Sequence, residues 1–394
     1  MSVVRAAFRP FALPLLNPIA TAHGVLRDRA GFLVSLEDDA GRVANGEATP
    51  FFEFGTEDLA ACEAALRRGL ADLVKGDGSL EAEGLIGKDA PCARSALGAA
   101  RLDLAAQSSG HSMAKALHLR SGREREVLPR VEVQALVQGS TPKAVSESAR
   151  AAYSAGFRTF KLKLAVDPER KAIELDLERV AALRSAVGVS GRIRLDANEA
   201  WTRNEAEQAF VHLAEFSVDF VEQPVARDAI ADLAAISEAG AIAVAADESL
   251  LGSGLARVLA ARAASVLVVK PAALGGVDAS LALVRRAREE GLRIVWSNLF
   301  EGRVGRALAI ALASATGEAG EVHGLGTAGL LTEDLAEREA AAAATTRERA
   351  KPGDAFAGGA IDVRETLAAS RAVAPAWSNV GGVFADGELW EVSA

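Results

Sequence analysis

The sequence predicts an α/β protein built from a modified (β/α)7β barrel, similar to a TIM barrel, and an α+β capping domain. Two observations lead to this fold. From Val131 to about Gly329, short β-branched runs alternate with amphipathic helical stretches, which is typical of a parallel sheet with helical crossovers. In addition, a polar side chain follows one run after another at its carboxyl end, where barrels place their active sites.

The first part of the chain follows a different pattern, and residues 1–128 are predicted to form the α+β domain. Strand signals come early and are separated by a polar turn at Asp38–Gly41. Alanine-rich stretches with helical spacing follow at Glu57–Leu73 and Ala93–Ala106. The change of pattern after them places the barrel over residues 129–330.

Seven runs within the barrel region have the composition of buried strands. They are Val131–Val137, Thr159–Leu164, Arg192–Leu195, Phe220–Val221, Ile242–Ala245, Val266–Val269 and Ile294–Trp296. Helical spacing of apolar residues predicts crossovers at Ser146–Ala155, Glu169–Val187, Glu205–Phe216, Ala229–Ala239, Ala279–Glu290 and Arg303–Ala315. Because one strand–helix unit cannot cover its own strand, successive units must form an open sheet or a closed barrel.

Side chains that can bind a metal or move a proton decide between these two arrangements. They stand at the carboxyl ends of successive runs, about one strand-plus-helix unit apart, and they are Lys163, Asp196, Glu222, Asp247, Lys270 and Ser297. In an open doubly wound sheet such residues would spread along a line, whereas a closed barrel brings them to one mouth. We therefore favour the barrel.

Three of these residues, Asp196, Glu222 and Asp247, are carboxylates with no His or Cys nearby in the sequence. An all-oxygen ligand set suits a hard cation such as Mg²⁺ rather than Zn²⁺. Each carboxylate alone has a simpler interpretation, because acidic residues at strand ends often cap the next helix. Together, at one register, they favour a Mg²⁺ site.

Strand alternation extends this set of residues. It places Lys161 on the same strand face as Lys163, and Arg194 on the same face as Asp196 and Asn198. A Lys-x-Lys pair by itself is most often a solvated strand edge. The order of charges at the predicted mouth, a cation, three anions and a cation, favours one shared catalytic site.

Composition limits the partners of the protein. The chain has 44 basic and 53 acidic side chains, a formal net charge of −9, and no basic block, so neither nucleic acid nor an anionic membrane is an expected partner. Only two cysteines are present, which fits a reducing cytoplasm better than a disulfide framework. Pro14, Asn17 and Pro18 interrupt the apolar run of the N-terminal segment, so a secretory signal is not expected there. No uninterrupted apolar stretch is long enough to span a membrane.

On these motifs the chain resembles the enolase superfamily, in its muconate-lactonizing-enzyme-like subgroup. The matching stretches are Phe160–Lys163, Leu195–Asn198, Val221–Pro224, Ala246–Ser249 and Val269–Pro271, with Gly46–Ala48 and Ala93–Leu97 in the cap. The resemblance implies that residues 331–394, which include an alanine-rich helix pattern at Glu337–Ala350, return to the cap.

The resemblance also implies a chemistry, the removal of a proton α to a carboxylate. Asp196, Glu222 and Asp247 would hold Mg²⁺, which offsets the charge of the resulting enediolate. Lys161 and Lys163 would face one side of the substrate, and Lys270 the other. The substrate would then be a small-molecule carboxylate, and the sequence leaves a homo-oligomer open.

Finer features separate the branches of the superfamily. Lys270 stands where the mandelate-racemase branch has a His–Asp pair, and Ser297–Glu301 lacks the Asp-x-Asp of dipeptide epimerases. Gly24–Leu26 with Arg29 and Gly31, Arg194, and His323–Thr327 are similar to the o-succinylbenzoate synthase family. This similarity implies a carbon–oxygen lyase that dehydrates 2-succinyl-6-hydroxy-2,4-cyclohexadiene-1-carboxylate in menaquinone biosynthesis. Its predicted substrate-binding residues are Arg194, Asn198, Ser297, Asn298, Gly326 and Thr327.

Two alternatives stay open on the sequence. One is a racemase of N-acylamino acids or a cycloisomerase that uses the same lysines and metal. The other, of a different class, is a barrel that binds a carboxylate without turnover. The early loop Asn17–Arg29 is expected either to cover the barrel mouth or to be an ordinary hairpin connection.

Overall fold

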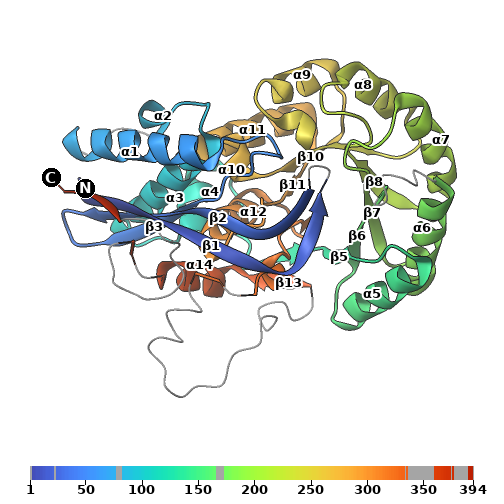
Figure 1. The fold of residues 1–394 in the computed structure, drawn as a ribbon, viewed down its shortest axis with the longest axis horizontal. Helices are drawn as coiled ribbons and strands as arrows, with labels where there is room; N and C mark the ends of the chain where they lie inside the picture. The colour runs from blue at the N-terminus through green and yellow to red at the C-terminus, as the bar shows by residue number, and fades with distance from the viewer. Residues whose placement is uncertain are drawn as a thin grey trace.

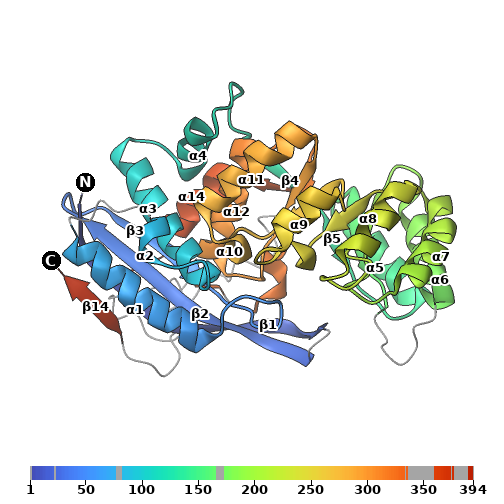
Figure 2. The ribbon, with the colours of Figure 1, turned by 90° about the horizontal axis from the view of Figure 1, so that it is seen from above.

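The computed structural model describes residues 2–21, 24–76, 82–165, 173–332, 334–335, 359–373, 375–376 and 389–393. A sheet with helices on one side forms the cap, and a ring of strands and helices forms the barrel beside it (Figures 1 and 2). The predicted helix Glu337–Ala350 and the start of the predicted helix Glu169–Val187 lie outside the described residues.

The cap sheet is antiparallel and has the order β14–β1–β2–β3. Its strands are β1 (Val3–Thr21), β2 (Gly24–Asp38), β3 (Val43–Ala48) and β14 (Trp390–Ser393). The helices of this part are α1 (Leu59–Lys75), α2 (Ala82–Leu85), α3 (Pro91–Ser108) and α4 (Met113–Ser121). Buried residues of α1 and α3, such as Leu66, Leu70 and Leu97, join Phe8 and Val34 of the sheet in one core.

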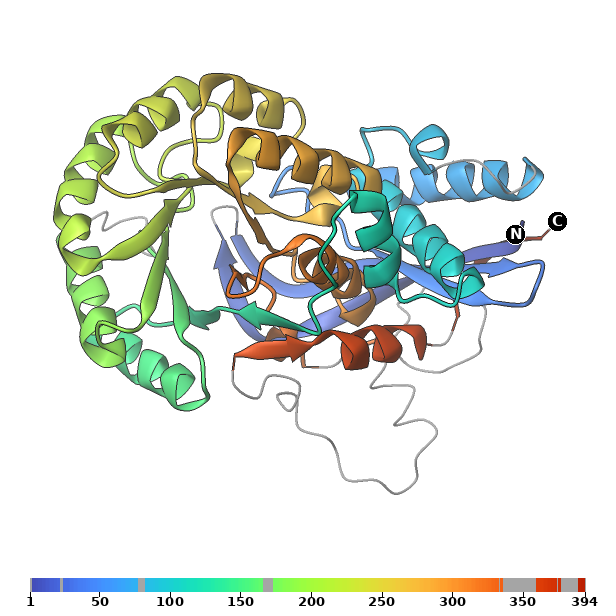
Figure 3. The ribbon, with the colours of Figure 1, turned by 180° about the vertical axis from the view of Figure 1, so that it is seen from behind.

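The barrel is built on a seven-stranded parallel sheet in which the strands follow one another in chain order. They are β5 (Ala135–Val137), β6 (Thr159–Lys163), β7 (Arg192–Asp196), β8 (Val218–Glu222), β9 (Val244–Ala246), β10 (Val266–Val269) and β11 (Arg293–Trp296). The crossovers are α5 (Pro142–Ser154), α6 (Ile173–Val187), α7 (Arg203–Leu213), α8 (Ile230–Ala239), α9 (Gly254–Ala261), α10 (Pro271–Leu274), α11 (Val277–Glu290) and α12 (Arg303–Thr316). Figure 3 shows helices α5 to α9 on the outside of the strands.

A further short strand, β12 (Val322–His323), connects the two edges of this sheet. It pairs in parallel with β4 (Arg130–Val133), which directly precedes β5. The Gly324 N–H donates to the Trp296 carbonyl of β11 at 2.7 Å, and the Gln134 N–H donates to the His323 carbonyl at 3.0 Å. The α/β barrel fold with a cap is therefore confirmed, although the two-residue β12 was not predicted and the first predicted strand is divided at Gln134.

The chain after the barrel contributes to both parts of the molecule. β13 (Ala360–Asp362) pairs with β4 in the antiparallel sense, and α14 (Val363–Arg371) follows it. β14 pairs with β1, with Arg5 opposite Ser393, so the two ends of the chain lie together (Figure 1). No helix in the described part of the chain combines the length and apolar composition that a membrane crossing needs.

Glu47 of β3 attaches the cap to the barrel. Its carboxylate accepts hydrogen bonds from the Gly302 N–H at 2.6 Å and the Gly305 N–H at 2.8 Å, at the start of α12. A side chain at residue 305 would place its Cβ 2.6 Å from Glu301 and 3.2 Å from Glu47, so this approach requires glycine. The contact gives two N–H groups of a helix N-terminus an acidic partner.

Glu47 should make the stability of the protein depend on pH. Burial raises the pKa of Glu47 to about 7 from an ordinary value of 4.5. An acid whose pKa is higher in the folded state stabilises the fold fully below its unfolded pKa, and this contribution is lost as the pH rises through the folded pKa. Compared with Glu47→Gln, the wild type should lose roughly 3 kcal/mol of unfolding free energy between pH 4.5 and 7. Urea unfolding of both proteins across this range measures it, and a difference that does not change with pH would contradict the expectation.

Candidate active site

The residues predicted at the strand ends meet because the barrel strands are parallel and in register. Lys163 is paired with Asp196, and Asp196 with Glu222, at the carboxyl ends of β6, β7 and β8. Asp247 directly follows β9, and Lys270 directly follows β10. Five consecutive strands therefore carry these groups to the same edge of the sheet.

Lys161 lies between two of the carboxylates. Its Nζ is 2.8 Å from the Asp196 Oδ2 atom and 2.7 Å from the Glu222 Oε1 atom. The Asp196 and Glu222 side chains are 3% and 1% exposed, and the Lys161 side chain is 13% exposed. Although burial alone would lower it, the charges of Asp196 and Glu222 raise the pKa of Lys161 above its ordinary value.

The carboxylates are crowded and need positive charge. Burial, together with the charge of Asp196, raises the pKa of Glu222 to about 8. Burial opposes ionisation of Asp196 too, but Lys161 and Lys163 outweigh it, and the pKa of Asp196 lies below its ordinary value. The Lys270 amine contacts both oxygens of Asp247. Each of the three acids thus faces a lysine.

The donor set can be tested for Mg²⁺. Asp196, Glu222 and Asp247 are buried, offer only oxygen atoms and come from adjacent strands, which fits a hard cation. As the side chains stand, no group of three His, Cys, Asp or Glu residues in the described chain is close enough to hold an ion. Lys161 and Lys270 contact the same carboxylate oxygens that a cation would use.

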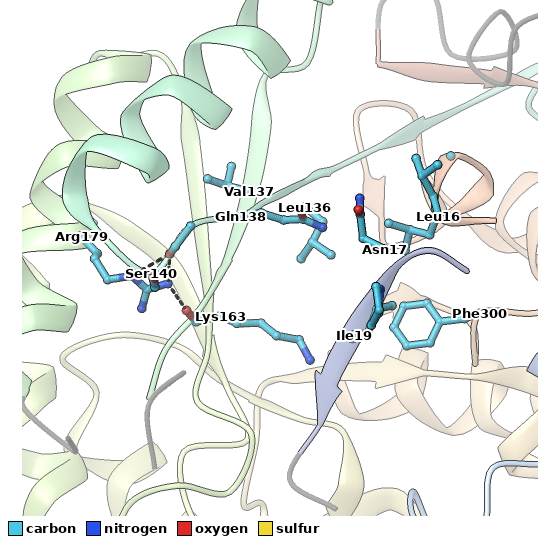
Figure 4. A pocket seen from close by; sticks show the side chains of 14 residues that line it. Leu16, Asn17, Ile19, Leu136, Val137, Gln138, Ser140, Lys163, Arg179 and Phe300 are labelled. Atoms are coloured by element: carbon cyan, nitrogen blue, oxygen red, sulfur yellow. Dashed lines mark hydrogen bonds between the residues drawn. The ribbon is translucent and has the colours of Figure 1, made fainter. Parts of the chain in front are cut away.

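A cavity of about 300 Å³ lies beside Lys163. Figure 4 shows the Lys163 amine extending into it, toward Ile19 and Phe300. The lining comes from β1, from β5 and its connection to α5, from β6 and α6, and from the segments after β11 and β12. It consists of Leu16, Asn17, Pro18, Ile19, Leu136, Val137, Gln138, Gly139, Ser140, Lys163, Arg179, Phe300, Gly329 and Leu330.

Sequence reasoning missed most of this lining, although one signal was present. Gln138, Gly139 and Ser140 directly follow the first predicted strand, so the rule that selected Lys163 and Asp196 also selects them. Leu16 and Leu330 left no such signal, because their place depends on how distant segments fold over the mouth. The Asn17–Ile19 part of the early loop does line the cavity, while Ala22 and His23 lie outside the described residues.

Most of the predicted substrate-binding residues contact one another or the barrel. The Asn298 amide donates to the Thr327 hydroxyl at 2.8 Å. The Asn198 amide donates to the Glu248 carboxylate at 3.4 Å, beside Asp247. The Ser297 hydroxyl is 3.5 Å from the Gly324 carbonyl, and a Cβ on Gly326 would lie 3.0 Å from the Gln134 carbonyl. None of the six belongs to the described lining of the cavity beside Lys163.

Arg194 lies deeper in the barrel than the sequence prediction placed it. Its Nε donates to Asp219 at 2.9 Å, and its Nη1 donates to the Gln134 side chain and the Val322 carbonyl, both at 2.8 Å. The side chain is 1% exposed, and burial lowers the pKa of Arg194 to about 10. These contacts connect β7, β8 and β12 and occupy the guanidinium inside the barrel.

A capped α/β barrel with carboxylates and lysines at its carboxyl-end mouth belongs to the class of barrel enzymes. Residues 144–375, more than half of the chain, match the family described as enolase C-terminal domain-like. The chain belongs to this family, in the muconate-lactonizing-enzyme-like subgroup of the enolase superfamily, as its motifs predicted.

Known relatives carry different activities. The chain is 38% identical to the o-succinylbenzoate synthase of Thermobifida fusca over 52% of its own length and 62% of that enzyme, less than two thirds. It is 30% identical to the o-succinylbenzoate synthase of Thermosynechococcus vestitus over 77% of this chain and 86% of that one. It is 26% identical to the L-Ala-D/L-Glu epimerase of Bacillus subtilis, over 77% of this chain and 83% of that enzyme. The solved N-succinyl Arg/Lys racemase of Bacillus cereus shares the fold, with a TM-score of 0.75, 21% identity and coverage of 93% and 97%.

Proposed function

We propose that the protein is a Mg²⁺-dependent dehydratase that converts 2-succinyl-6-hydroxy-2,4-cyclohexadiene-1-carboxylate to o-succinylbenzoate, a step of menaquinone biosynthesis. One observation carries the proposal. At the barrel mouth, Lys161 and Lys270 are held by carboxylates, whereas the Lys163 amine extends into a cavity and has no ion-pair partner among the described residues. An amine in that position suits proton transfer to and from a bound substrate.

The proposed reaction needs two contributions from these groups. Removing the proton α to a carboxylate leaves an enediolate with two negative charges, and the site must supply positive charge to stabilise it. When bound by Asp196, Glu222 and Asp247, Mg²⁺ supplies part of that charge to the substrate carboxylate. Lys163 takes the α-proton and returns a proton to the departing hydroxide. Lys270 adds positive charge from the opposite side, and Lys161 orients Asp196 and Glu222.

The charge of the cavity supports a substrate with an acidic or neutral arm. Lys163 and Arg179 are the ionisable side chains in its described lining, and the Arg179 charge is paired with Asp176. The second carboxylate of a succinyl arm therefore meets no acidic side chain in this lining. An arm that carries an ammonium group meets no acidic partner in the described lining, which argues against dipeptides of lysine or arginine.

A racemase of N-acylamino acids is the second candidate, and a cycloisomerase would use the same groups. The arrangement that favours racemisation is the pair Lys163 and Lys270, on strands β6 and β10 at the two flanks of the carboxylates. Two bases on opposite sides are what racemisation needs. The structural likeness to an N-succinyl amino acid racemase agrees with this candidate in fold.

A direct assay tests the proposal. The purified protein with Mg²⁺ should consume the cyclohexadiene substrate, chelation of the metal should abolish turnover, and added Mg²⁺ should restore it. The racemase hypothesis is tested with N-succinylamino acids in deuterated water. A racemase should exchange the α-proton of these substrates for deuterium, and the Lys270→Arg variant should lose this exchange. A dehydratase should still convert the cyclohexadiene substrate when it carries Lys270→Arg. If no carboxylate tested shows Mg²⁺-dependent turnover or α-proton exchange, the protein is a binding barrel and the proposal fails.

A further inference from the structure

A buried ion pair on α6 lies directly behind Lys163. The Arg179 Nη1 atom is 2.6 Å from the Asp176 Oδ1 atom, one helical turn apart. The Arg179 side chain is 1% exposed and the Asp176 side chain 11%. Two charges removed from water require several hydrogen bonds to be stable, so their remaining partners indicate what the pair holds in place.

Arg179 uses its other donors on backbone carbonyls of two strand ends. Its Nη2 donates to the Lys163 carbonyl at 2.9 Å and to the Gly139 carbonyl at 2.9 Å, and its Nε donates to Gly139 at 3.1 Å. Figure 4 shows these bonds between the guanidinium, the loop at Ser140 and the backbone of Lys163. The fork of N–H groups thereby connects the end of β6 to the loop after β5.

Asp176 holds the same strand end from the other side. Its Oδ2 atom accepts a hydrogen bond from the Ala165 N–H at 2.7 Å. Ala165 has a φ of 49°, a left-handed conformation that an alanine rarely adopts without support. Together, Asp176 and Arg179 contact the residue that carries the proposed base and the residue two positions after it.

Gly139 shows that the second strand end is also tightly specified. Its φ is 137°, and an added Cβ would lie 2.7 Å from the Val145 nitrogen, so only glycine fits. Gly139 and its neighbours Gln138 and Ser140 line the cavity. The carbonyl that Arg179 binds therefore belongs to the wall that faces the Lys163 amine.

We propose that the Asp176–Arg179 pair positions Lys163 for proton transfer by fixing its backbone against the cavity wall at Gly139. The inference rests on the proposed function. Arg179 acts through Lys163 and the loop, so it is a positioning residue. A displacement of about 1 Å between reacting groups lowers rates about 100-fold, and this sets the size of the expected effect.

The same helix supplies a matched control. Arg184 also binds backbone carbonyls, donating to Phe216 at 3.0 Å and to Gly188 and Gly191 at 2.6 Å. These carbonyls precede β7 and β8, at the end of the strands opposite Lys163. Arg184→Met therefore removes a comparable set of bonds from α6 while leaving the catalytic end of the barrel intact.

The experiment compares Arg179→Met and Arg184→Met with the wild type on the cyclohexadiene substrate with Mg²⁺. Arg179→Met should lower kcat about 100-fold with a change in KM below about five-fold, and should increase the isotope effect of an α-deuterated substrate. Arg184→Met should stay within about two-fold in kcat and in the isotope effect. Arg179→Lys, which keeps the charge but not the fork, should also be slow.

A readout that does not need turnover accompanies these assays. Amide hydrogen exchange of the peptide that ends β6 should accelerate in Arg179→Met and in Asp176→Asn but not in Arg184→Met. Both changes disturb the Asp176 carboxylate, which accepts the hydrogen bond of the Ala165 N–H. Equal losses of kcat in the arginine variants at positions 179 and 184, or none in either, would overturn the inference. A wild type without activity on any carboxylate would instead remove the proposed function, and the inference with it.

Discussion

Lys163→Met should lower kcat by about 1,000-fold while the protein stays folded, because a positioned general base contributes roughly 10²- to 10⁴-fold to the rate. Methionine matches the length of the lysine but cannot accept a proton. The Lys163 amine has no ion-pair partner among the described residues, so its removal leaves no buried carboxylate unpaired. Steady-state kinetics with the cyclohexadiene substrate measures the loss, and thermal unfolding by circular dichroism checks the fold.

Two further lysine variants make this result specific. Lys143 on α5 is exposed and 3.9 Å from Glu147, so Lys143→Met should leave both kcat and stability unchanged. Lys161→Met should behave differently from Lys163→Met, because it leaves Asp196 and Glu222 buried without their cation and should destabilise the fold. Activity of Lys163→Met within ten-fold of the wild type would show that another group removes the proton.

Asp196→Asn should lose about 3 kcal/mol of transition-state stabilisation, or roughly 100-fold in kcat/KM, comparable to removing one preorganised oxyanion donor. The substitution preserves the shape of the side chain but removes one of the three negative charges proposed to hold Mg²⁺. It also weakens the contact of Lys161 with the Asp196 carboxylate. Rates measured over a series of Mg²⁺ concentrations should show a higher metal requirement.

Asp219 provides the control for this substitution. It is a barrel aspartate on β8 that pairs with Arg194 and Arg293, both at 2.9 Å, and it stands three residues before Glu222. Asp219→Asn should lower the melting temperature without changing the Mg²⁺ requirement. If Asp196→Asn costs less than about ten-fold, or if both variants change the metal requirement equally, the three carboxylates do not hold the metal as proposed.

The alternation of strands and helices was enough to predict the barrel, because each unit repeats the same pattern over a long stretch of chain. The carboxyl-end rule brought Lys163, Asp196 and Glu222 to one edge, since in-register parallel strands end together. Arg194 shows the limit of this reasoning. The alternation of side chains along a strand assigns a residue to the barrel interior but does not say how far it lies from the mouth. Arg194 precedes Asp196 by two residues, which corresponds to about 6.6 Å along a strand.

The cavity and the interface between cap and barrel could not be predicted in the same way. Glu47 binds Gly302, and Leu16 shares the cavity lining with Leu330, across hundreds of residues of sequence. Such contacts depend on how the cap lies on the barrel, and no local pattern encodes that arrangement. Arg179 likewise reads as a helix residue, and its role follows from the direction of its guanidinium.

The pairing of Arg5 with Ser393 has a consequence for how the molecule is made. During translation β2 follows β1 directly, but β14, on the other side of β1, is synthesised only after the whole barrel. Trp390, which stacks on Phe8 at 5.4 Å, reaches the sheet after the whole barrel has emerged. The cap therefore has a high contact order, and the edge of β1 that β14 covers stays open to other nascent chains until the strand after the barrel has been made.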